Sequence, residues 1–341
     1  MIILLTGGCK NGKSGIAQKL AVFLAKRGQR QLFYVATMKS TGPEDDERIR
    51  RHVKDRAGLG FNTIELKEKI STLLIEVGNY GEGNAAQSCG HGTFLIDSTT
   101  ALLANEMFRE NEEGHFFTDK DAAVRVAAEL EALIKSALEN DDDLIFVSDG
   151  IYSDAAVYEG DTFLYREALG MLERTVSKDA DLVIEMCAGV PVIHKEGSGL
   201  TEDKELMDQL NRVIDKKGAL IIGGAAQGKR AYVKRELGIT DEEIYTFDAN
   251  DIMDGNIGVP GGYKVYDHVE RLALSEGKDE HELADLFPDD AALICEDITC
   301  GIVPMSKEDR RWRDDAGRLM QALGAGREVV RVFCGKGTRI G

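Results

Sequence analysis

The sequence predicts an α/β protein whose mostly parallel sheet is covered by helices on both faces. Short apolar runs are typical of buried strands, and five of them occur at residues 2–5, 31–38, 93–97, 144–148 and 181–186. Segments with apolar residues at helical spacing alternate with them, the clearest at residues 119–138 and 163–176. In such a chain the strands pair in parallel, the helices form the crossovers, and ligands bind at the carboxyl ends of the strands.

The loop after the first strand carries the most informative motif. Residues 7–14 (GGCKNGKS) match the pattern G-x-x-x-x-G-K-[ST] without a mismatch, and a helical pattern follows. Glycines let backbone N–H groups converge on a phosphate, and the positive end of the helix dipole also attracts the phosphate. The alternative interpretation is a glycine-rich turn before an ordinary helix. We expect Lys13 to reach the β- and γ-phosphates and the Ser14 hydroxyl to ligate Mg²⁺. The predicted nucleotide-binding residues of this loop are Gly7, Gly8, Cys9, Lys10, Asn11, Gly12, Lys13 and Ser14.

The next predicted helix, at residues 45–56, is heavily charged. His52 lies there among cations that include Arg48 and Arg51. A histidine in a surface charge run usually has no function, but neighbouring cations favour the neutral, nucleophilic form of an imidazole. The same cations could hold phosphates, so all three residues are candidates for the site.

An acidic residue closes the strand at residues 93–97. A P-loop enzyme places the carboxylate that positions Mg²⁺ or water at such a strand end, so Asp97 is a candidate catalytic residue and Mg²⁺ ligand. The alternative is that Asp97 caps the following helix, a role that Ser98 could fill equally well. Before this strand, the sequence predicts a strand at residues 61–66, a short helix at 67–77 and a mobile glycine-rich loop at 79–92.

The composition limits the classes of function. The formal charge of −18 argues against a nucleic-acid partner, because binding a phosphate backbone needs clustered Lys and Arg. No apolar run approaches the roughly 18 residues of a membrane span, and no signal peptide precedes the first strand. The six cysteines form no C-x₂-C pair, so we expect a cytoplasmic protein with free thiols and no structural zinc site.

The second half of the chain repeats the first. After a linker at residues 196–199 and a connecting helix at about 204–217, residues 219–236 (ALIIGGAAQGKRAYVKRE) copy the opening strand, loop and helix. Arg230 stands where the first copy has Ser14, so the hydroxyl that would ligate Mg²⁺ is missing. The predicted organisation is a P-loop domain at residues 1–196, a linker with its helix at 197–217, and a truncated, degenerate second copy at 218–341.

The two copies have complementary losses. The second copy is expected to lack the stretch that holds His52 and the strand that ends at Asp97. It keeps a loop at residues 296–304 with a Gly-Ile-Val-Pro turn, whose counterpart at 149–157 has lost the Gly and the Pro. We hypothesise that the copies pack so that this loop completes the site; the alternative is a structural turn in a degenerate scaffold. The candidate residues of the loop are Glu296, Asp297, Gly301 and Pro304.

These blocks together resemble one family, the bifunctional adenosylcobinamide kinases / adenosylcobinamide-phosphate guanylyltransferases of cobalamin biosynthesis. In the first copy the matching segments are TGGCKNGKS at residues 6–14, YVAT at 34–37, Arg48-Ile49-x-x-His52 and LIDSTT at 95–100. In the second copy they are residues 296–304 and 310–318 and the final FCGKGTRIG. The P-loop alone is generic, but its ordered combination with R-I-x-x-H and G-I-V-P is specific.

The resemblance implies a RecA-like P-loop fold that carries two reactions. A nucleoside triphosphate, with ATP and GTP both open as the donor, would phosphorylate the aminopropanol hydroxyl of adenosylcobinamide. GMP from GTP would then pass through a histidine, matched by His52, to the phosphate of this small-molecule corrinoid. Mg²⁺ and the surrounding cations would stabilise charge on the transferring group, and homo-oligomers are expected.

The chain departs from the family pattern at several positions. A typical member carries the P-loop, the histidine and G-I-V-P in one copy, whereas here they are divided. Asp97 stands where the acid is commonly Glu, and Gly150 replaces the acid that Asp297 preserves. A descendant with only one of the two activities is therefore an alternative, as is a non-catalytic nucleotide-binding or regulatory protein. The acidic charge disfavours a RecA-like DNA motor.

Overall fold

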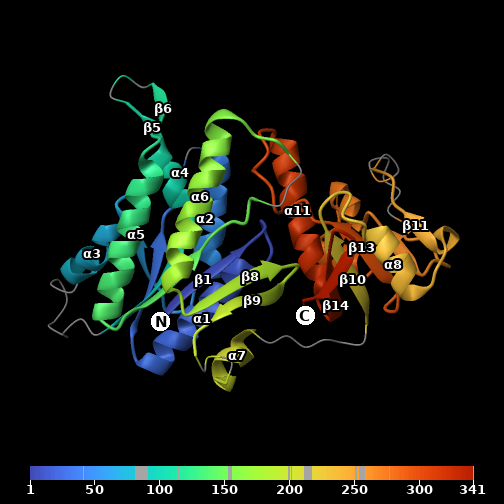
Figure 1. Ribbon diagram of the computed structural model, residues 1–341, viewed down its shortest axis with the longest axis horizontal. Helices are drawn as coiled ribbons and strands as arrows, with labels where there is room; N and C mark the ends of the chain where they lie inside the picture. Colours follow the sequence, from blue (N-terminus) through green and yellow to red (C-terminus); the bar gives the residue numbers. More distant parts are fainter. Residues whose placement is uncertain are drawn as a thin grey trace.

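Two sheets of mostly parallel strands lie side by side in the computed structural model, with helix α11 (Lys307–Gly324) between them (Figure 1). We call the elements of residues 1–210 the first unit and those of residues 217–340 the second unit. The structure describes residues 1–40, 42–80, 91–111, 113, 115–152, 156–198, 200, 202–210, 217–249, 252, 258–275 and 277–340.

The sheet of the first unit has seven strands in the order β3-β2-β4-β7-β1-β8-β9. Neighbouring strands are parallel except β9, which returns antiparallel to β8. Their bounds are β1 Ile2–Gly7, β2 Gln31–Ala36, β3 Asn62–Glu65, β4 Gly92–Asp97, β7 Asp143–Val147, β8 Leu182–Cys187 and β9 Val190–Glu196. The remaining elements outside the two helical layers are α2 Pro43–Asp55, η1 Ile70–Thr72, α3 Leu73–Tyr80 and the hairpin β5 Phe108–Glu110 with β6 Phe116–Thr118.

Helices cover both faces of this sheet. α4 (Thr99–Met107), α5 (Ala122–Glu139) and α6 (Gly160–Asp179) share one hydrophobic cluster with Ile2 and Leu4 of β1. α1 (Lys13–Gly28) and α7 (Lys204–Leu210) share the other cluster with Ile3 and Leu5. Successive residues of a strand point to opposite faces, so a strand covered on both sides has a continuous apolar sequence. The predicted α/β fold with a mostly parallel sheet is confirmed.

The second unit has a six-stranded sheet in the order β11-β12-β13-β10-β14-β15. The central β10 pairs in parallel with β13 and β14, as β1 pairs with β7 and β8, and the antiparallel β15 takes the edge place of β9. The strands are β10 Lys217–Gly223, β11 Ile244–Thr246, β12 Val265–Asp267, β13 Ala292–Glu296, β14 Arg327–Phe333 and β15 Lys336–Arg339. The other elements among the described residues are α8 Lys229–Leu237, η2 Asp241–Glu243, η3 Val269–Leu274, α10 Glu280–Ala284 and α11.

One expectation about the second half is wrong. The strand that ends at Asp97 has a counterpart, because β12 lies between β11 and β13 as β4 lies between β2 and β7, and β12 ends at Asp267. This strand is three residues long and matches no motif of the first copy, so the sequence pattern missed it. The connecting helix expected at about residues 204–217 is described over Lys204–Leu210, residues 211–216 lie outside the described residues, and Lys217 begins β10.

Three smaller predictions concern the glycine-rich loop, the cysteines and membrane spans. The glycine-rich segment expected as a mobile loop includes residues 81–90, which lie outside the described residues. Five cysteines are described and all have free thiols, whereas Cys89 falls in the part that is not described. Within the described ranges, no helix is long and apolar enough to cross a membrane.

Candidate active site

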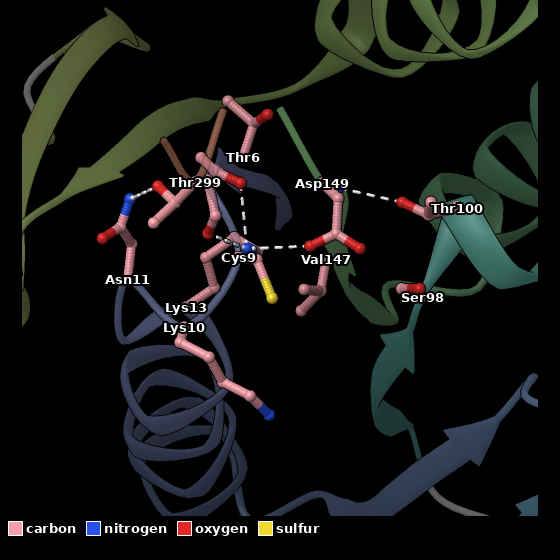
Figure 2. A network of polar contacts seen from close by, with 12 residues as sticks. Thr6, Cys9, Lys10, Asn11, Lys13, Ser98, Thr100, Val147, Asp149 and Thr299 are labelled. Atoms are coloured by element: carbon pink, nitrogen blue, oxygen red, sulfur yellow. Dashed lines mark hydrogen bonds and ion pairs between the residues drawn. The ribbon is translucent and has the colours of Figure 1, made fainter. Parts of the chain in front are cut away.

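The P-loop joins β1 to α1 at the carboxyl edge of the first sheet (Figure 2). Gly7 has φ +136° and Gly12 has φ +87°, which are backbone conformations that residues other than glycine rarely adopt. A Cβ on Gly7 would lie 2.3 Å from the backbone oxygen of Met186, so the loop passes β8 too closely for any larger residue. Gly12 is the N-cap of α1, which directs the first N–H groups of that helix into the loop.

Lys13 lies folded back over the loop with its side chain 6% exposed. Its Nζ donates to the carbonyl oxygens of Gly7 at 2.9 Å and Gly8 at 2.6 Å, and it pairs with Asp149 Oδ1 at 2.9 Å (Figure 2). Asp149 follows β7, the strand next to β1. Sequence reasoning missed this acid as a site residue because only the strand order places it beside the lysine.

Asp97 ends β4 and faces the start of α1. The Ser14 hydroxyl lies 3.4 Å from Asp97 Oδ2, and the Tyr34 hydroxyl donates to the same oxygen at 2.9 Å. The alternative role of helix cap belongs to Ser98, whose side chain accepts from Ala101 N at 3.2 Å. Hydroxyl and carboxylate oxygens are ligands that Mg²⁺ takes in phosphate sites, so Ser14 and Asp97 fit the predicted ion.

A cavity of about 420 Å³ opens over the P-loop. Its walls come from the P-loop, from β2 and α2, and from the ends of β4 and β7. Buried Arg56 lines it as well, with its guanidinium 4.0 Å from the centre of the Tyr34 ring. The volume lies within the range of small-molecule sites, and we call this space the nucleotide cavity.

Helix α2 forms one wall of the nucleotide cavity through Ile49, Arg51 and Val53. Arg51 was predicted as a site residue, and the structure places it at this wall. The side chains of Arg48 and His52, on the same helix, lie outside the described part of the chain.

The second unit packs directly on the P-loop (Figure 2). Cys9 N donates to the backbone oxygen of Thr299 at 3.1 Å, and Asn11 Nδ2 donates to Thr299 Oγ1 at 3.2 Å. A Cβ on Gly8 would lie 2.1 Å from Thr299 Oγ1, so the close packing of the two units requires glycine at this position. Gln321 of α11 donates to the backbone oxygen of Lys10 and lines the nucleotide cavity.

The Cys9 thiol is a hydrogen-bond donor across the same boundary. Its Sγ donates to Asp314 Oδ1 at 3.0 Å, and Asp314 also lies 3.9 Å from Lys10 Nζ. Burial, followed by the charges of Asp314 and Asp149, raises the pKa of Cys9 to about 11. The thiol therefore stays protonated at neutral pH and keeps its contact with the second unit.

The loop at residues 296–304 thus reaches the P-loop, but through residues that sequence reasoning did not name. Thr299 and Cys300 make the contact with Gly8 and its neighbours. Asp297 acts indirectly, because its Oδ1 accepts from Thr299 N at 3.1 Å and from Thr299 Oγ1 at 2.6 Å. Among the described residues that line the nucleotide cavity, none is one of the four predicted from this loop: Glu296, Asp297, Gly301 and Pro304.

The repeated loop of the second unit has a different site. Lys229 Nζ donates to two loop carbonyls at 3.0 and 2.7 Å, as the lysine of the first unit does. Arg230 Nη1 lies 3.3 Å from Asp267 Oδ2, in the place where Ser14 faces Asp97 in the first unit. A guanidinium already supplies positive charge to that carboxylate, which disfavours Mg²⁺ at this position.

Among the solved structures that resemble this chain are three with low identity. The flagellar accessory protein FlaH of Methanocaldococcus jannaschii is 16% identical, with 57% of this chain and 78% of that chain covered and a TM-score of 0.32. A KaiC-like protein of Pyrococcus horikoshii OT3 is 15% identical, with 57% and 79% covered and a TM-score of 0.32. The DNA-packaging ATPase of Sulfolobus Turreted Icosahedral Virus is 13% identical, with 54% and 74% covered and a TM-score of 0.30. Likenesses this weak carry no argument about function.

A family of proteins gives a more informative match. No curated protein matches the chain. The family described as cobinamide kinase / cobinamide phosphate guanyltransferase matches residues 3–193, which include the whole P-loop, α2 and Asp97. This match spans more than half of the sequence, and the chain therefore belongs to the cobinamide kinase / cobinamide phosphate guanyltransferase family.

Proposed function

We propose that the chain phosphorylates adenosylcobinamide and then transfers GMP from GTP to the product, with His52 carrying the guanylyl group. The observation that carries the proposal is the arrangement of Lys13, Ser14 and Asp97 around a cavity of nucleotide size. Membership of the family supports both activities. ATP and GTP remain alternative phosphoryl donors for the first step.

In the kinase step, the substrate hydroxyl attacks the γ-phosphorus and gives up its proton to water, the bond to the bridging oxygen breaks, and the nucleoside diphosphate leaves. The Lys13 ammonium would exchange its two loop carbonyls for phosphate oxygens, while Asp149 remains its counter-ion. Ser14 and Asp97 would hold Mg²⁺, which neutralises phosphate charge when it is bound.

In the transferase step, the His52 imidazole attacks the α-phosphorus of GTP, an N–P bond forms, and pyrophosphate leaves. A phosphate oxygen of the acceptor then attacks the same phosphorus, and the N–P bond breaks to release the imidazole. The assignment is supported by the position of His52 on α2, three of whose residues line the nucleotide cavity.

Incubation with GTP carrying labelled α-phosphorus tests the proposal. The denatured wild-type protein should retain the label, and His52→Ala should lose it. His115→Ala is the matched control, because this histidine is 75% exposed and lies between β5 and β6, away from the nucleotide cavity. Label that persists in His52→Ala would exclude a guanylyl group on His52.

A kinase-only protein is the second candidate. It is favoured by the division of the family pattern between the units, because none of the predicted residues of the Gly-Ile-Val-Pro loop lies among the described residues that line the nucleotide cavity. Transfer of labelled γ-phosphorus to adenosylcobinamide, without any label from the α-phosphorus on the protein, would identify this outcome.

A further inference from the structure

A second cavity, of about 690 Å³, lies between the two units and adjoins the nucleotide cavity. The two cavities share Cys9, Lys10, Arg51 and Asp149, so a molecule in the second cavity would meet the phosphate end of a bound nucleotide. We call this space the interunit cavity. Its opposite wall belongs to the second unit, chiefly to α11 and to the segments before it.

The wall from the second unit has an excess of positive charge. Six cations line it: Lys278, Lys307, Arg310, Arg311, Arg313 and Arg318. Three acids lie among them: Glu280, Asp314 and Asp315. The chain as a whole has a net charge of −18, so this wall contrasts with the charge of the rest of the molecule. The first unit adds Lys10 and Arg51 together with Asp45, Glu47 and Asp149, so the whole lining keeps an excess of positive charge. A concave surface with an excess of one sign of charge concentrates ligands of the opposite sign.

Two of these arginines position the loop that meets the P-loop. Buried Arg313 donates from Nη2 to the backbone oxygen of Thr299 at 2.8 Å, the same oxygen that accepts from Cys9 N. The Nε atom of Arg313 is buried and has no hydrogen-bond partner among the described residues, so this cation retains an unused donor beside the cavity. Arg310 donates to the backbone oxygens of Pro304 and Met305.

The cavity also has an apolar side. Its lining includes Ile151 of the first unit and Leu283, Ile302, Val303 and Leu319 of the second unit. A cavity with an apolar surface, a cationic wall and a border with the nucleotide site suits an amphipathic molecule that carries a phosphate. A simple nucleotide would leave the apolar surface unused, and an uncharged alcohol would leave the cationic wall unused.

We propose that the interunit cavity is the acceptor site and binds the phosphorylated end of the acceptor, with the second unit supplying most of the cations. This assignment rests on the proposed function, because it takes the acceptor to be the phosphate ester made in the kinase step. The phosphate lies beside Lys10 and Arg51, next to the nucleotide, and the organic part lies along the apolar surface. The second unit is therefore a working part of the site, and a scaffold role alone does not account for its cationic wall.

Charge reversal on the exposed part of the wall tests this proposal without disturbing the loop. The test variant combines Lys278→Glu, Lys307→Glu and Arg311→Glu, three exposed residues of the cavity wall. The control combines Arg235→Glu, Lys336→Glu and Arg339→Glu, which change the net charge equally on exposed residues of the same unit that do not line the cavity. Binding of adenosylcobinamide phosphate to the full chain is measured by equilibrium dialysis, followed by the visible absorption of the corrinoid.

We expect the test variant to bind the corrinoid phosphate about tenfold more weakly or worse, with a matching rise in its KM for guanylyl transfer. The control should bind as the wild type does, and all three proteins should acquire the same label from GTP. Three outcomes would overturn the acceptor site. They are wild-type affinity in the test variant, an equal loss of affinity in the control, and no corrinoid binding by a wild-type protein that GTP does label. Absence of label from every protein would instead overturn the transferase part of the proposed function, which separates the two failures.

Discussion

The ion pair between Glu185 of β8 and Arg331 of β14 connects the two units, and it makes a measurable prediction. The Arg331 guanidinium donates to the two Glu185 oxygens at 2.7 and 2.9 Å. The side chains are 20% and 30% exposed. Fully exposed pairs contribute about 0.2–1 kcal/mol, whereas removing one partner of a buried pair costs about 3–5 kcal/mol. We therefore expect Glu185→Gln to lower the free energy of unfolding by about 2 kcal/mol, a value between these limits.

A double-mutant cycle measures the coupling itself. Glu185→Gln, Arg331→Gln and the double variant are unfolded in urea at pH 7, with fluorescence of Trp312 as the signal. This residue is the only tryptophan of the chain and lies on α11, so it reports on the second unit. We expect a coupling energy of about 1.5 kcal/mol. Coupling below about 0.3 kcal/mol, the usual error of additivity, would refute the structural argument.

The same pair predicts how the effect depends on pH. Burial by itself raises the pKa of Glu185, but hydrogen bonds and charge from Arg331, and after it from His194, outweigh it and hold the pKa below the ordinary value. A carboxyl with a lowered pKa in the folded state adds stability above its unfolded pKa of about 4.3, and this stability is lost as the pH falls through the folded value. The difference between the wild type and Glu185→Gln should therefore shrink below about pH 4. An undiminished difference at pH 3 would contradict this account.

Three further predictions concern other contacts. Gly8→Ala would place its Cβ 2.1 Å from Thr299 Oγ1, so the thermal midpoint should fall by an amount equivalent to about 1–3 kcal/mol. Adding Thr299→Ala to the same chain should restore part of this stability. No restoration would argue against the contact. Ser14→Ala removes the hydroxyl that faces Asp97. We expect about a hundredfold loss of Mg²⁺-dependent phosphoryl transfer at unchanged thermal stability. Wild-type turnover would exclude Ser14 as a ligand of Mg²⁺. The Glu106 carboxylate is 1% exposed and pairs with cations, and Glu106→Gln removes its charge. Calorimetry should show a loss of about 3 kcal/mol in the free energy of unfolding, with kinase activity kept at low temperature. A loss below about 0.5 kcal/mol would contradict the burial of this charge.

The local features of the site could be predicted because they depend on neighbours along the chain. The glycines at residues 7 and 12, Lys13 and Ser14 form one continuous loop, whose backbone requirements are visible in the sequence itself. Asp97 was predicted as a candidate because a buried strand ends there, and the position of the Ser98 side chain shows that Ser98 caps the following helix.

The tertiary structure alone decided which distant residues meet at that loop. Asp149 faces Lys13 because β7 lies beside β1. The sequence of neither strand specifies which strand lies next to it in the sheet. Thr299 meets Asn11 across 288 residues, and no local periodicity specifies such a contact. The sequence by itself determined a phosphate loop with its helix, since hydrogen bonds and glycine conformations act within a few residues. Only packing of the two units determined that the second half closes over this loop, because burial depends on surfaces that exist only after both sheets have formed.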